Sequence, residues 1–281
     1  MTQVRLSYAY GTSSQPLLGM TIGEKFDQAC QQYAEQDAVV SVHQNVRLSY
    51  KQLQDQVNAF ACSLLQLDLE KGDRIAIWSP NCVEWTITQF AAFKAGMILV
   101  NLNPAYKSSE LEYVLNKVSC KALVIAPQFK SSNYQDILTK IAPEITQSID
   151  KLLSSQRLPH LKHIIKIDHE QHTGIHRFAD LLPEPTAAQL DQLQAIAADL
   201  QFDETINIQF TSGTTGNPKG TMLTHNNILN NGYFVGEAIH LTSQDRVCIS
   251  VPLFHCFGMV MGNLACITHG STMVYPSAVF N

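Results

Sequence analysis

Helix and strand patterns alternate between residues 50 and 125, and this alternation restricts the fold more than any other feature of the chain. Apolar residues in 50–67 recur at steps of three, four and one, which predicts an amphipathic helix. The expected elements that follow are strands at 74–78, 97–100 and 122–125 and helices at 85–95 and 108–118, the first of these helices ending at Gly96. Strands separated by helices predict an α/β fold with mostly parallel sheets flanked by helices.

The second half of the chain is less regular until residue 205. We read 127–203 as surface helices and linkers on the same domain, with one strand at 163–167. Residues 205–210 alternate polar and apolar side chains, so we expect a half-buried strand with Ile206, Ile208 and Phe210 on one face. Further strands are expected at 221–223, 246–251 and 271–275, a helix capped by Thr224 near residue 225, and a turn at 252–258 leading into an apolar helix.

Composition excludes several classes of protein. Charged residues make up 15% and the net charge is −5, which argues against disordered charged tails and against a broad basic surface for nucleic acid. We find no signal-peptide pattern, and His255 and Asn263 interrupt the most apolar stretch, 251–267, so we expect no membrane span. The seven cysteines are scattered, which favours small core residues in a reducing compartment and hence a cytoplasmic protein.

Histidines cluster in the irregular region. They are His160, His163, His169, His172 and His176. No cysteine or paired carboxylate accompanies them at ligand spacing, so we expect solvated surface histidines, with a metal site as the alternative.

The segment after the strand at 205–210 carries the most chemical information. It reads Thr211, Ser212, Gly213, Thr214, Thr215, Gly216, Asn217, Pro218, Lys219 and Gly220. Its hydroxyl groups can donate hydrogen bonds, and its glycines allow consecutive backbone N–H groups to converge on one cluster of oxygens. Lys219 adds a compact positive charge. These features predict a phosphate-binding loop, and a plain polar hairpin tip is the alternative.

A Walker-type phosphate loop is the second alternative for this segment. That motif needs glycine directly before its lysine and a hydroxyl residue directly after it. Here Pro218 precedes Lys219 and has no N–H to donate, and Gly220 follows it and has no hydroxyl. The residue chemistry therefore argues against a Walker loop.

The run from Thr211 to Gly220 resembles the nucleotide loop of the adenylate-forming superfamily, which includes acyl-CoA synthetases, luciferases and the adenylation domains of peptide synthetases. Residues 47–53, 93–104 and 252–258 resemble other landmarks of that family, in the same order. Residues 77–85 and 100–106 are most similar to the medium-chain fatty-acyl-CoA synthetase branch. The resemblance covers nearly the whole chain and is weakest over 150–200.

The resemblance implies an activity. Family members activate a carboxylate with ATP to an acyl-adenylate, and the thiolate of coenzyme A then displaces AMP. Two anions must meet in the first step, so positioned donors and cations lower its barrier. By resemblance, the segment from Thr211 to Lys219 wraps the β- and γ-phosphates, which Mg²⁺ bridges, and Lys219 screens the departing pyrophosphate. No residue of this chain is assigned as a metal ligand.

The resemblance also assigns substrate contacts in the turn at 252–258. Taken alone, His255 reads as a core histidine, whereas the resemblance places it beside the acyl carboxylate and the adenylate, as a second catalytic candidate with Lys219. Phe254, Phe257 and Gly258 would border the acyl tunnel, with plain core packing as the alternative. Cys256 has no base near it in sequence, so we do not expect a nucleophile there. His225 is expected at a helix start, and Arg47 and Glu84 in structural roles.

The chain departs from the family pattern at its C-terminal end. Before Asn281 we find no Tyr-Gly-x-Thr-Glu segment, no ribose-binding Thr-Gly-Asp, no hinge and no small domain with a catalytic lysine. We therefore expect residues 1–281 to be the N-terminal portion of an adenylation domain, inactive alone, with fatty acid, ATP and coenzyme A as the substrates of the whole enzyme. A non-catalytic nucleotide- or protein-binding module is the alternative. The acid, the oligomeric state and a weak peripheral contact with membranes stay open.

Overall fold

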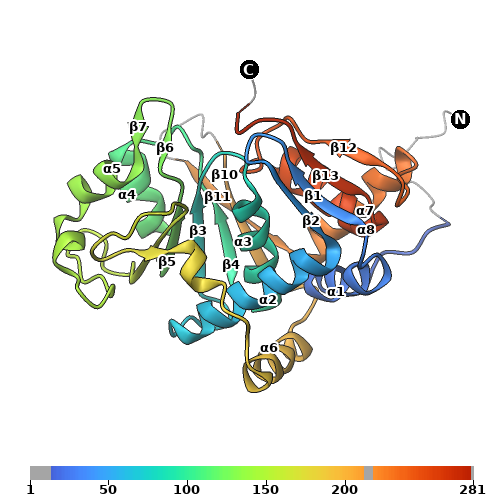
Figure 1. Ribbon diagram of the computed structural model, residues 1–281, viewed down its shortest axis with the longest axis horizontal. Coiled ribbons are helices and arrows are strands. Elements are labelled where there is room, and N and C mark those ends of the chain that lie inside the picture. Colours follow the sequence, from blue (N-terminus) through green and yellow to red (C-terminus); the bar gives the residue numbers. More distant parts are fainter. Residues whose placement is uncertain (1–13, 212–217, 280–281) are drawn as a thin grey trace, which may run out of the picture.

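Two β-sheets stand side by side, with helices between and around them (Figure 1). The computed structural model describes residues 14–211 and 218–279. The larger sheet has the order β11 (Lys219–Thr224), β10 (Thr205–Thr211), β4 (Ile98–Asn101), β3 (Arg74–Trp78), β5 (Ala122–Ile125), β8 (His163–Lys166) and β9 (His176–Arg177). All its neighbours are parallel except β10 and β11. The predicted α/β fold with mostly parallel sheets is confirmed.

The smaller sheet pairs strands from residues 37–49 with strands from residues 246–275. Its order is β12 (Arg246–Cys248), β13 (Thr272–Tyr275), β1 (Asp37–Ser41) and β2 (Val46–Ser49). β1 and β13 are parallel, with Val39 opposite Met273, and β1 and β2 form an antiparallel pair. A separate two-stranded hairpin is made by β6 (Gln128–Phe129) and β7 (Ser132–Asn133).

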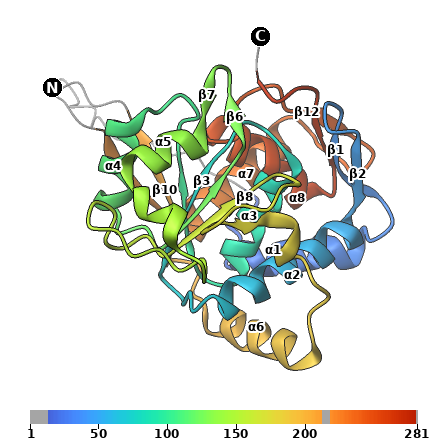
Figure 2. The same cartoon turned by 60° about the vertical axis from the view of Figure 1, so that its left-hand side comes forward.

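Alternating side chains of the larger sheet feed two cores. In β3, Ile75 and Ile77 belong to one apolar cluster, whereas Ala76 and Trp78 belong to the other. Successive side chains of a strand point to opposite faces, so each face needs its own cover. Helices α4 (Ser108–Lys117) and α5 (Tyr134–Ile141) supply the cover on one face, and α2 (Tyr50–Gln66) and α3 (Val83–Lys94) supply it on the other (Figure 2).

Helix α3 lies in the middle of the molecule, between the two sheets (Figure 1). All of its residues except Glu84 are buried. Its buried polar side chains have partners inside the protein, since Gln89 accepts from Asn263 and Lys94 pairs with Asp27, so the helix can be covered on every side. Gly96, with φ +68°, lies just beyond its C-terminal end, as predicted.

Further helices pack around these elements. They are α1 (Ile22–Gln32), α6 (Ala187–Asp199), α7 (His225–Ala238), α8 (Ala265–His269) and the short turns η1 (Pro143–Gln147) and η2 (Phe178–Leu181). The Thr224 side chain accepts from the Asn227 N–H, which confirms the predicted cap of α7. In α6 Leu193 is the buried residue, and the helix lies at the bottom of Figures 1 and 2.

The histidine-rich region is more buried than predicted. His163 is 8% exposed in β8, and its Nδ1 lies 3.4 Å from Nε2 of His176 in β9. Burial, and then the neighbouring His163, lower the pKa of His176 to about 4. The expectation of solvated surface histidines is therefore wrong for this pair. Within 14–211 and 218–279, no group of three or more His, Cys, Asp or Glu side chains is placed to hold a metal ion.

Strand β10 departs from simple alternation. Ile206 packs in the cluster on one side of the sheet, whereas Ile208 and Phe210 pack in the other, and Asn207 is fully buried. The register against β11 shifts between Thr205 and Asn207, and such a bulge moves the following side chains to the opposite face. The prediction of one shared apolar face was therefore wrong.

Two expectations near the C-terminal end also change. The strand expected at 246–251 ends at Cys248, and the apolar helix after the turn begins as a π-helix, η3 (Phe257–Leu264), before α8. No helix in the described part of the chain has the length and apolar character needed to cross a membrane. Five of the seven cysteines are buried, which confirms that most of them are core residues.

Candidate active site

The candidate site lies beyond the carboxyl-terminal ends of the parallel strands of the larger sheet. β3 is followed along the chain by β4 on one side of it and by β5 on the other. The crossover helices α3 and α4 pack in different clusters, on opposite faces. Ligands of open α/β sheets bind beyond the carboxyl ends of the strands where the strand order reverses in this way. The end of β10 and the start of the expected nucleotide loop lie at this same edge.

The expected nucleotide loop joins β10 to β11 as the tip of a hairpin. Thr211 pairs with Lys219, and the Thr211 hydroxyl donates to the Lys219 carbonyl oxygen at 3.5 Å. Both side chains are exposed and Pro218 is half-buried. The other predicted loop residues lie outside the described residues: Ser212, Gly213, Thr214, Thr215, Gly216 and Asn217.

The hairpin bears on the two alternatives for this segment. A Walker loop connects a strand to a helix, whereas this segment connects two antiparallel strands. The structure thus adds a topological argument against the Walker alternative. The described ends of the segment, Thr211 and Lys219, pair as the last residues of a hairpin, and their exposed side chains are compatible with phosphate binding.

His255 is exposed, so its interpretation as a core histidine, made from the residues alone, was wrong. Its Nδ1 accepts from the Phe257 N–H at 3.2 Å. Because that nitrogen is an acceptor, the neutral ring carries its proton on Nε2, which is left as a donor. Phe257 is 52% exposed, and Phe254 is half-buried. The turn therefore presents a polar donor between two partly uncovered rings.

Gly258 packs against backbone. A Cβ at this position would lie 2.4 Å from the carbonyl oxygen of Pro252, a distance that real side chains do not reach. The residue is buried, and its N–H donates to the His255 carbonyl oxygen at 3.0 Å. Glycine is needed here so that the start of η3 can fold back onto the turn.

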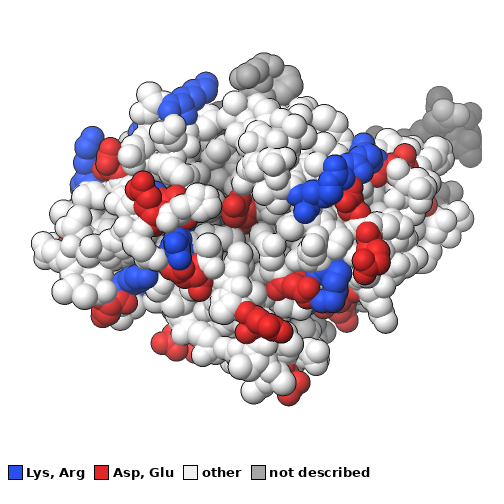
Figure 3. Space-filling view, viewed as in Figure 1, with Lys and Arg blue, Asp and Glu red and all other residues white. Residues whose placement is uncertain are grey.

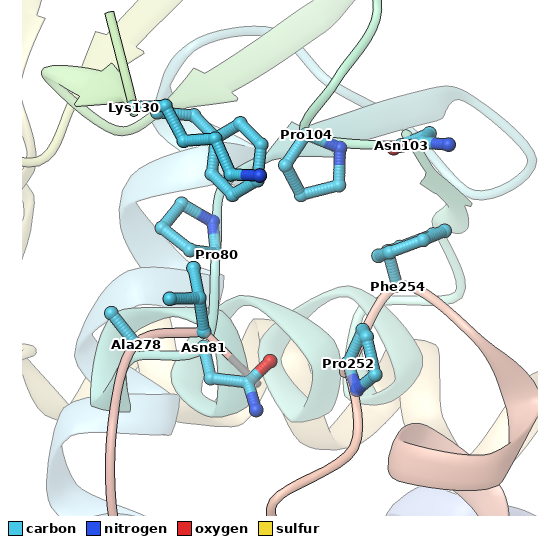
Figure 4. A pocket seen from close by; sticks show the side chains of 10 residues that line it. Pro80, Asn81, Asn103, Pro104, Lys130, Pro252, Phe254 and Ala278 are labelled. Carbon is cyan, nitrogen blue, oxygen red and sulfur yellow. The ribbon is translucent and has the colours of Figure 1, made fainter. Parts of the chain in front are cut away.

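A cavity of about 140 Å³ opens beside the turn. Pro80, Pro104 and Phe254 line it together with Lys130 of the β6–β7 hairpin (Figure 4). The stacked rings of Trp78 and Tyr134 hold the part of the cavity wall formed by residues 103–104. Trp78 Nε1 donates to the Asn103 carbonyl oxygen at 3.1 Å, and the Tyr134 hydroxyl donates to that of Pro104 at 2.7 Å.

Two buried asparagines hold the turn against the larger sheet. Asn81 Nδ2 donates to the Val251 carbonyl oxygen at 2.9 Å, and its Oδ1 accepts from the Leu253 N–H at 2.8 Å. Asn101 Nδ2 donates to the Phe254 carbonyl oxygen at 3.2 Å. Sequence reasoning noticed both segments as family landmarks but assigned the asparagines no task. The available signal was an amide at the end of a buried strand or within three residues after it.

Other residues occupy the roles that were expected, with one exception. Arg47 pairs with Asp37, and Glu84 accepts from Gln44 at 2.8 Å. His225 is buried at the start of α7, where its Nδ1 accepts from the Ile22 N–H at 3.1 Å. The exception is Cys256: its Sγ lies 3.6 Å from His255 Nδ1, so a base does stand beside it.

Charges of both signs are mixed on the face of the molecule that Figure 3 shows. In the space-filling view, Lys and Arg side chains lie beside Asp and Glu side chains (Figure 3). On the smaller sheet, for example, Asp37 pairs with both Arg47 and Arg246.

Comparisons with known proteins identify the family of the chain. The sequence model of the family described as "AMP-binding enzyme" matches residues 26–280. The chain belongs to the AMP-binding enzyme family. The predicted resemblance to adenylate-forming enzymes is thereby confirmed.

Relatives of this AMP-binding enzyme include "Medium-chain acyl-CoA ligase ACSF2, mitochondrial" of Macaca fascicularis, 43% identical over 280 residues, which cover 98% of this chain and 45% of the relative. The protein of the same name from Homo sapiens is 42% identical over 285 residues, covering 98% and 46%. The chain thus spans just under half the length of these relatives. Their names place them in mitochondria, and the cytoplasmic location expected for this chain stays a prediction.

Solved structures share the fold of this AMP-binding enzyme. The anthranilate CoA ligase AuaEII, solved in complex with anthranoyl-AMP, matches with a TM-score of 0.76 at 22% identity, over 94% of this chain and 46% of that one. The N-terminal domain of FACL13 from Mycobacterium tuberculosis matches with a TM-score of 0.70 at 23% identity, over 93% and 58%.

Proposed function

We propose that this chain is the N-terminal portion of an adenylation domain, and that the protein containing it is an AMP-forming acid–CoA ligase acting on medium-chain fatty acids. The observation that carries the proposal is the family match across residues 26–280, together with relatives named medium-chain acyl-CoA ligase at 42–43% identity. The reaction would form an acyl-adenylate from ATP and a fatty acid and then pass the acyl group to coenzyme A.

Two groups of this chain would share the work of the first step. Lys219 and the hydroxyl of Thr211 leave the sheet side by side at the hairpin, where their exposed side chains could hold the β- and γ-phosphates. His255 would donate from Nε2 to the carboxylate of the acid, because its Nδ1 already accepts from the backbone. The apolar cavity beside Phe254 would exclude water from one side of this meeting point.

Magnesium would enter this site with the nucleotide. The described residues proposed to contact substrate, Thr211, Lys219, Phe254, His255 and Phe257, include no carboxylate, and Mg²⁺ prefers oxygen ligands with several waters and substrate phosphates. These residues therefore make no cage for the ion. When bound, Mg²⁺ neutralises phosphate charge, and the residues of this chain add to that charge balance from the protein side.

The test uses the protein expressed from its complete reading frame. Incubated with ATP, medium-chain fatty acids and radiolabelled pyrophosphate, it should exchange label into ATP in an acid-dependent way, and it should form acyl-CoA when coenzyme A is added. Residues 1–281 expressed alone should do neither. Folded full-length protein that binds ATP but exchanges no label with any acid would favour the alternative, a non-catalytic nucleotide-binding module.

A further inference from the structure

A line of buried amide groups connects the two halves of the candidate site. Asn207 of β10 donates from Nδ2 to Asn101 Oδ1 of β4 at 3.0 Å and to the Leu99 carbonyl oxygen at 2.8 Å. Asn101 in turn donates from Nδ2 to the Phe254 carbonyl oxygen at 3.2 Å. Its Nδ2 also lies 3.4 Å from Met259 Sδ. One side chain therefore contacts the chain on both sides of His255.

These buried amides can fix the position of the 252–258 turn relative to β10. Asn101 is 2% exposed and Asn207 is 0% exposed, so water does not compete for these hydrogen bonds. Asn207 stands in the strand that ends at Thr211, directly before the expected nucleotide loop. Phe254 and Met259 bracket the His255 turn, whose N–H groups at Gly258 and Met259 both donate to the His255 carbonyl oxygen.

Packing alone does not explain why asparagine stands at positions 101 and 207. Asn207 Oδ1 is buried and accepts no hydrogen bond from the described residues, and a buried amide left half-satisfied costs free energy that an apolar residue would not. The neighbouring positions of β4 and β10, Leu99 and Ile206, are apolar and equally buried. Amides at 101 and 207 thus fit a positioning role better than a space-filling one.

We propose that Asn101 is a positioning residue for acyl-adenylate formation. It fixes the His255 turn against β10, and so fixes the position of the His255 side chain, proposed to bind the acid, relative to the nucleotide loop. The inference rests on the proposed function. It concerns geometry rather than binding, because Asn101 is buried and is not proposed to touch substrate. The expected consequence is a loss of turnover that leaves the affinity for ATP unchanged.

The experiment compares matched variants of the full-length protein. Asn101→Leu keeps the branched shape of the side chain and removes its hydrogen bonds. Asn101→Asp keeps size and shape, and as a carboxylate it still accepts from Asn207 but cannot donate to Phe254. The control is Asn230→Leu, because Asn230 is also a buried asparagine with several hydrogen bonds, made to Leu18 and Asn226 rather than to the 252–258 turn.

Pyrophosphate exchange and hydrogen exchange are measured on each variant. Both Asn101 variants should lower kcat for adenylate formation about 10- to 100-fold with KM for ATP within about twofold, because misplacement of this order costs rate rather than nucleotide binding. Amide exchange in 253–260 should rise in both Asn101 variants and stay unchanged in Asn230→Leu. If Asn101→Leu does not fold, the same two measurements on Asn101→Asp decide the outcome.

The outcomes separate the two proposals. If wild-type protein exchanges label and the Asn101 variants match Asn230→Leu in kcat, the positioning role is wrong while the proposed function stands. A parallel rise in KM for ATP would also overturn it, since that indicates general damage to the site. If the folded wild-type protein exchanges no label with any acid, the proposed function fails and the positioning role for that reaction fails with it.

Discussion

The β10–β11 hairpin, which carries Lys219, and the turn at 252–258, which carries His255, meet the rest of the molecule in different ways. β11 is an edge strand, exposed from Lys219 to Met222, and among the described strands β10 alone pairs with it. The turn has short-range backbone hydrogen bonds of its own, and in addition buried side chains of β4 and of the loop after β3 hold it at Val251, Leu253 and Phe254. The hairpin half of the candidate site is thus exposed to a ligand, and the half formed by the turn is held by buried side chains of the larger sheet.

The hairpin offers the largest effect with which to test this contrast. Lys219→Ala should slow adenylate formation by about 10²- to 10³-fold, since it removes the exposed cation proposed to hold the leaving pyrophosphate. The second half-reaction, measured from synthetic acyl-adenylate and coenzyme A, should change little. The control is Lys51→Ala, whose lysine pairs with Asp55 on the surface of α2. Equal slowing of both half-reactions would contradict the assignment.

The free energy of unfolding should depend on pH through His225, at the base of the hairpin. Burial lowers the pKa of His225, directly after β11, to about 4. In the unfolded chain the pKa is about 6.5, so the unfolded state binds the extra proton between these values and the free energy of unfolding falls as the pH drops from 6.5 towards 4. The His225 share of this loss should reach roughly 2 to 3 kcal/mol.

Denaturant titrations at several pH values measure that share. His225→Gln should flatten the acid limb relative to wild type, whereas His240→Gln, which changes an exposed histidine beyond α7, should leave it unaltered. Identical slopes in wild type and His225→Gln would show that the buried neutral ring of His225 does not contribute to the pH dependence of stability.

Two glycines compare the regions directly. Gly258→Ala should lower the free energy of unfolding by about 1–3 kcal/mol, because the new methyl group meets the Pro252 carbonyl oxygen at 2.4 Å. Gly220→Ala in β11 should stay within about 0.5 kcal/mol, because its Cβ meets the Ile208 side chain at 3.2 Å on an exposed strand. Urea unfolding of both variants tests this, and a larger effect at Gly220 would reverse the contrast.

The smallest effect is expected at Cys256. Although its Sγ lies 3.6 Å from His255 Nδ1, that nitrogen already accepts from the Phe257 N–H. Cys256→Ala should therefore leave both half-reactions within about twofold of wild type. A loss above tenfold in exchange assays would show that the thiol takes part in the reaction.

The same contrast explains what could be read from the sequence. β3, β4 and β5 were predicted within a residue, because apolar runs between amphipathic helices leave parallel strands few alternatives. Local chemistry singled out the segment from Thr211 to Lys219 as a phosphate-binding loop, with a hairpin tip as the alternative, and its role in phosphate binding stays a prediction. Both signals lie within a short stretch of chain, so a single sequence reveals them.

The turn could not be predicted in the same way. The exposure of His255 depends on Asn81 and Asn101, which lie more than a hundred residues earlier in the chain. An apolar neighbourhood in sequence suggested burial, but Phe257 points outward as well. The bulge that turns Ile206 and Ile208 to different faces and the π-helical start of η3 likewise depend on tertiary packing rather than on local pattern.

The parallel pairing of β1 with β13 has a consequence for how the molecule is made. Val39 leaves the ribosome early, but its neighbour Met273 is among the last described residues to emerge. During synthesis β1 and β2 can form only a two-stranded ribbon, which is marginally stable, while β3, β4 and β5 already have their helical cover. Nascent chains released before β13 should therefore hold a finished larger sheet beside an unfinished smaller one, and chaperones would find their binding surface on the latter.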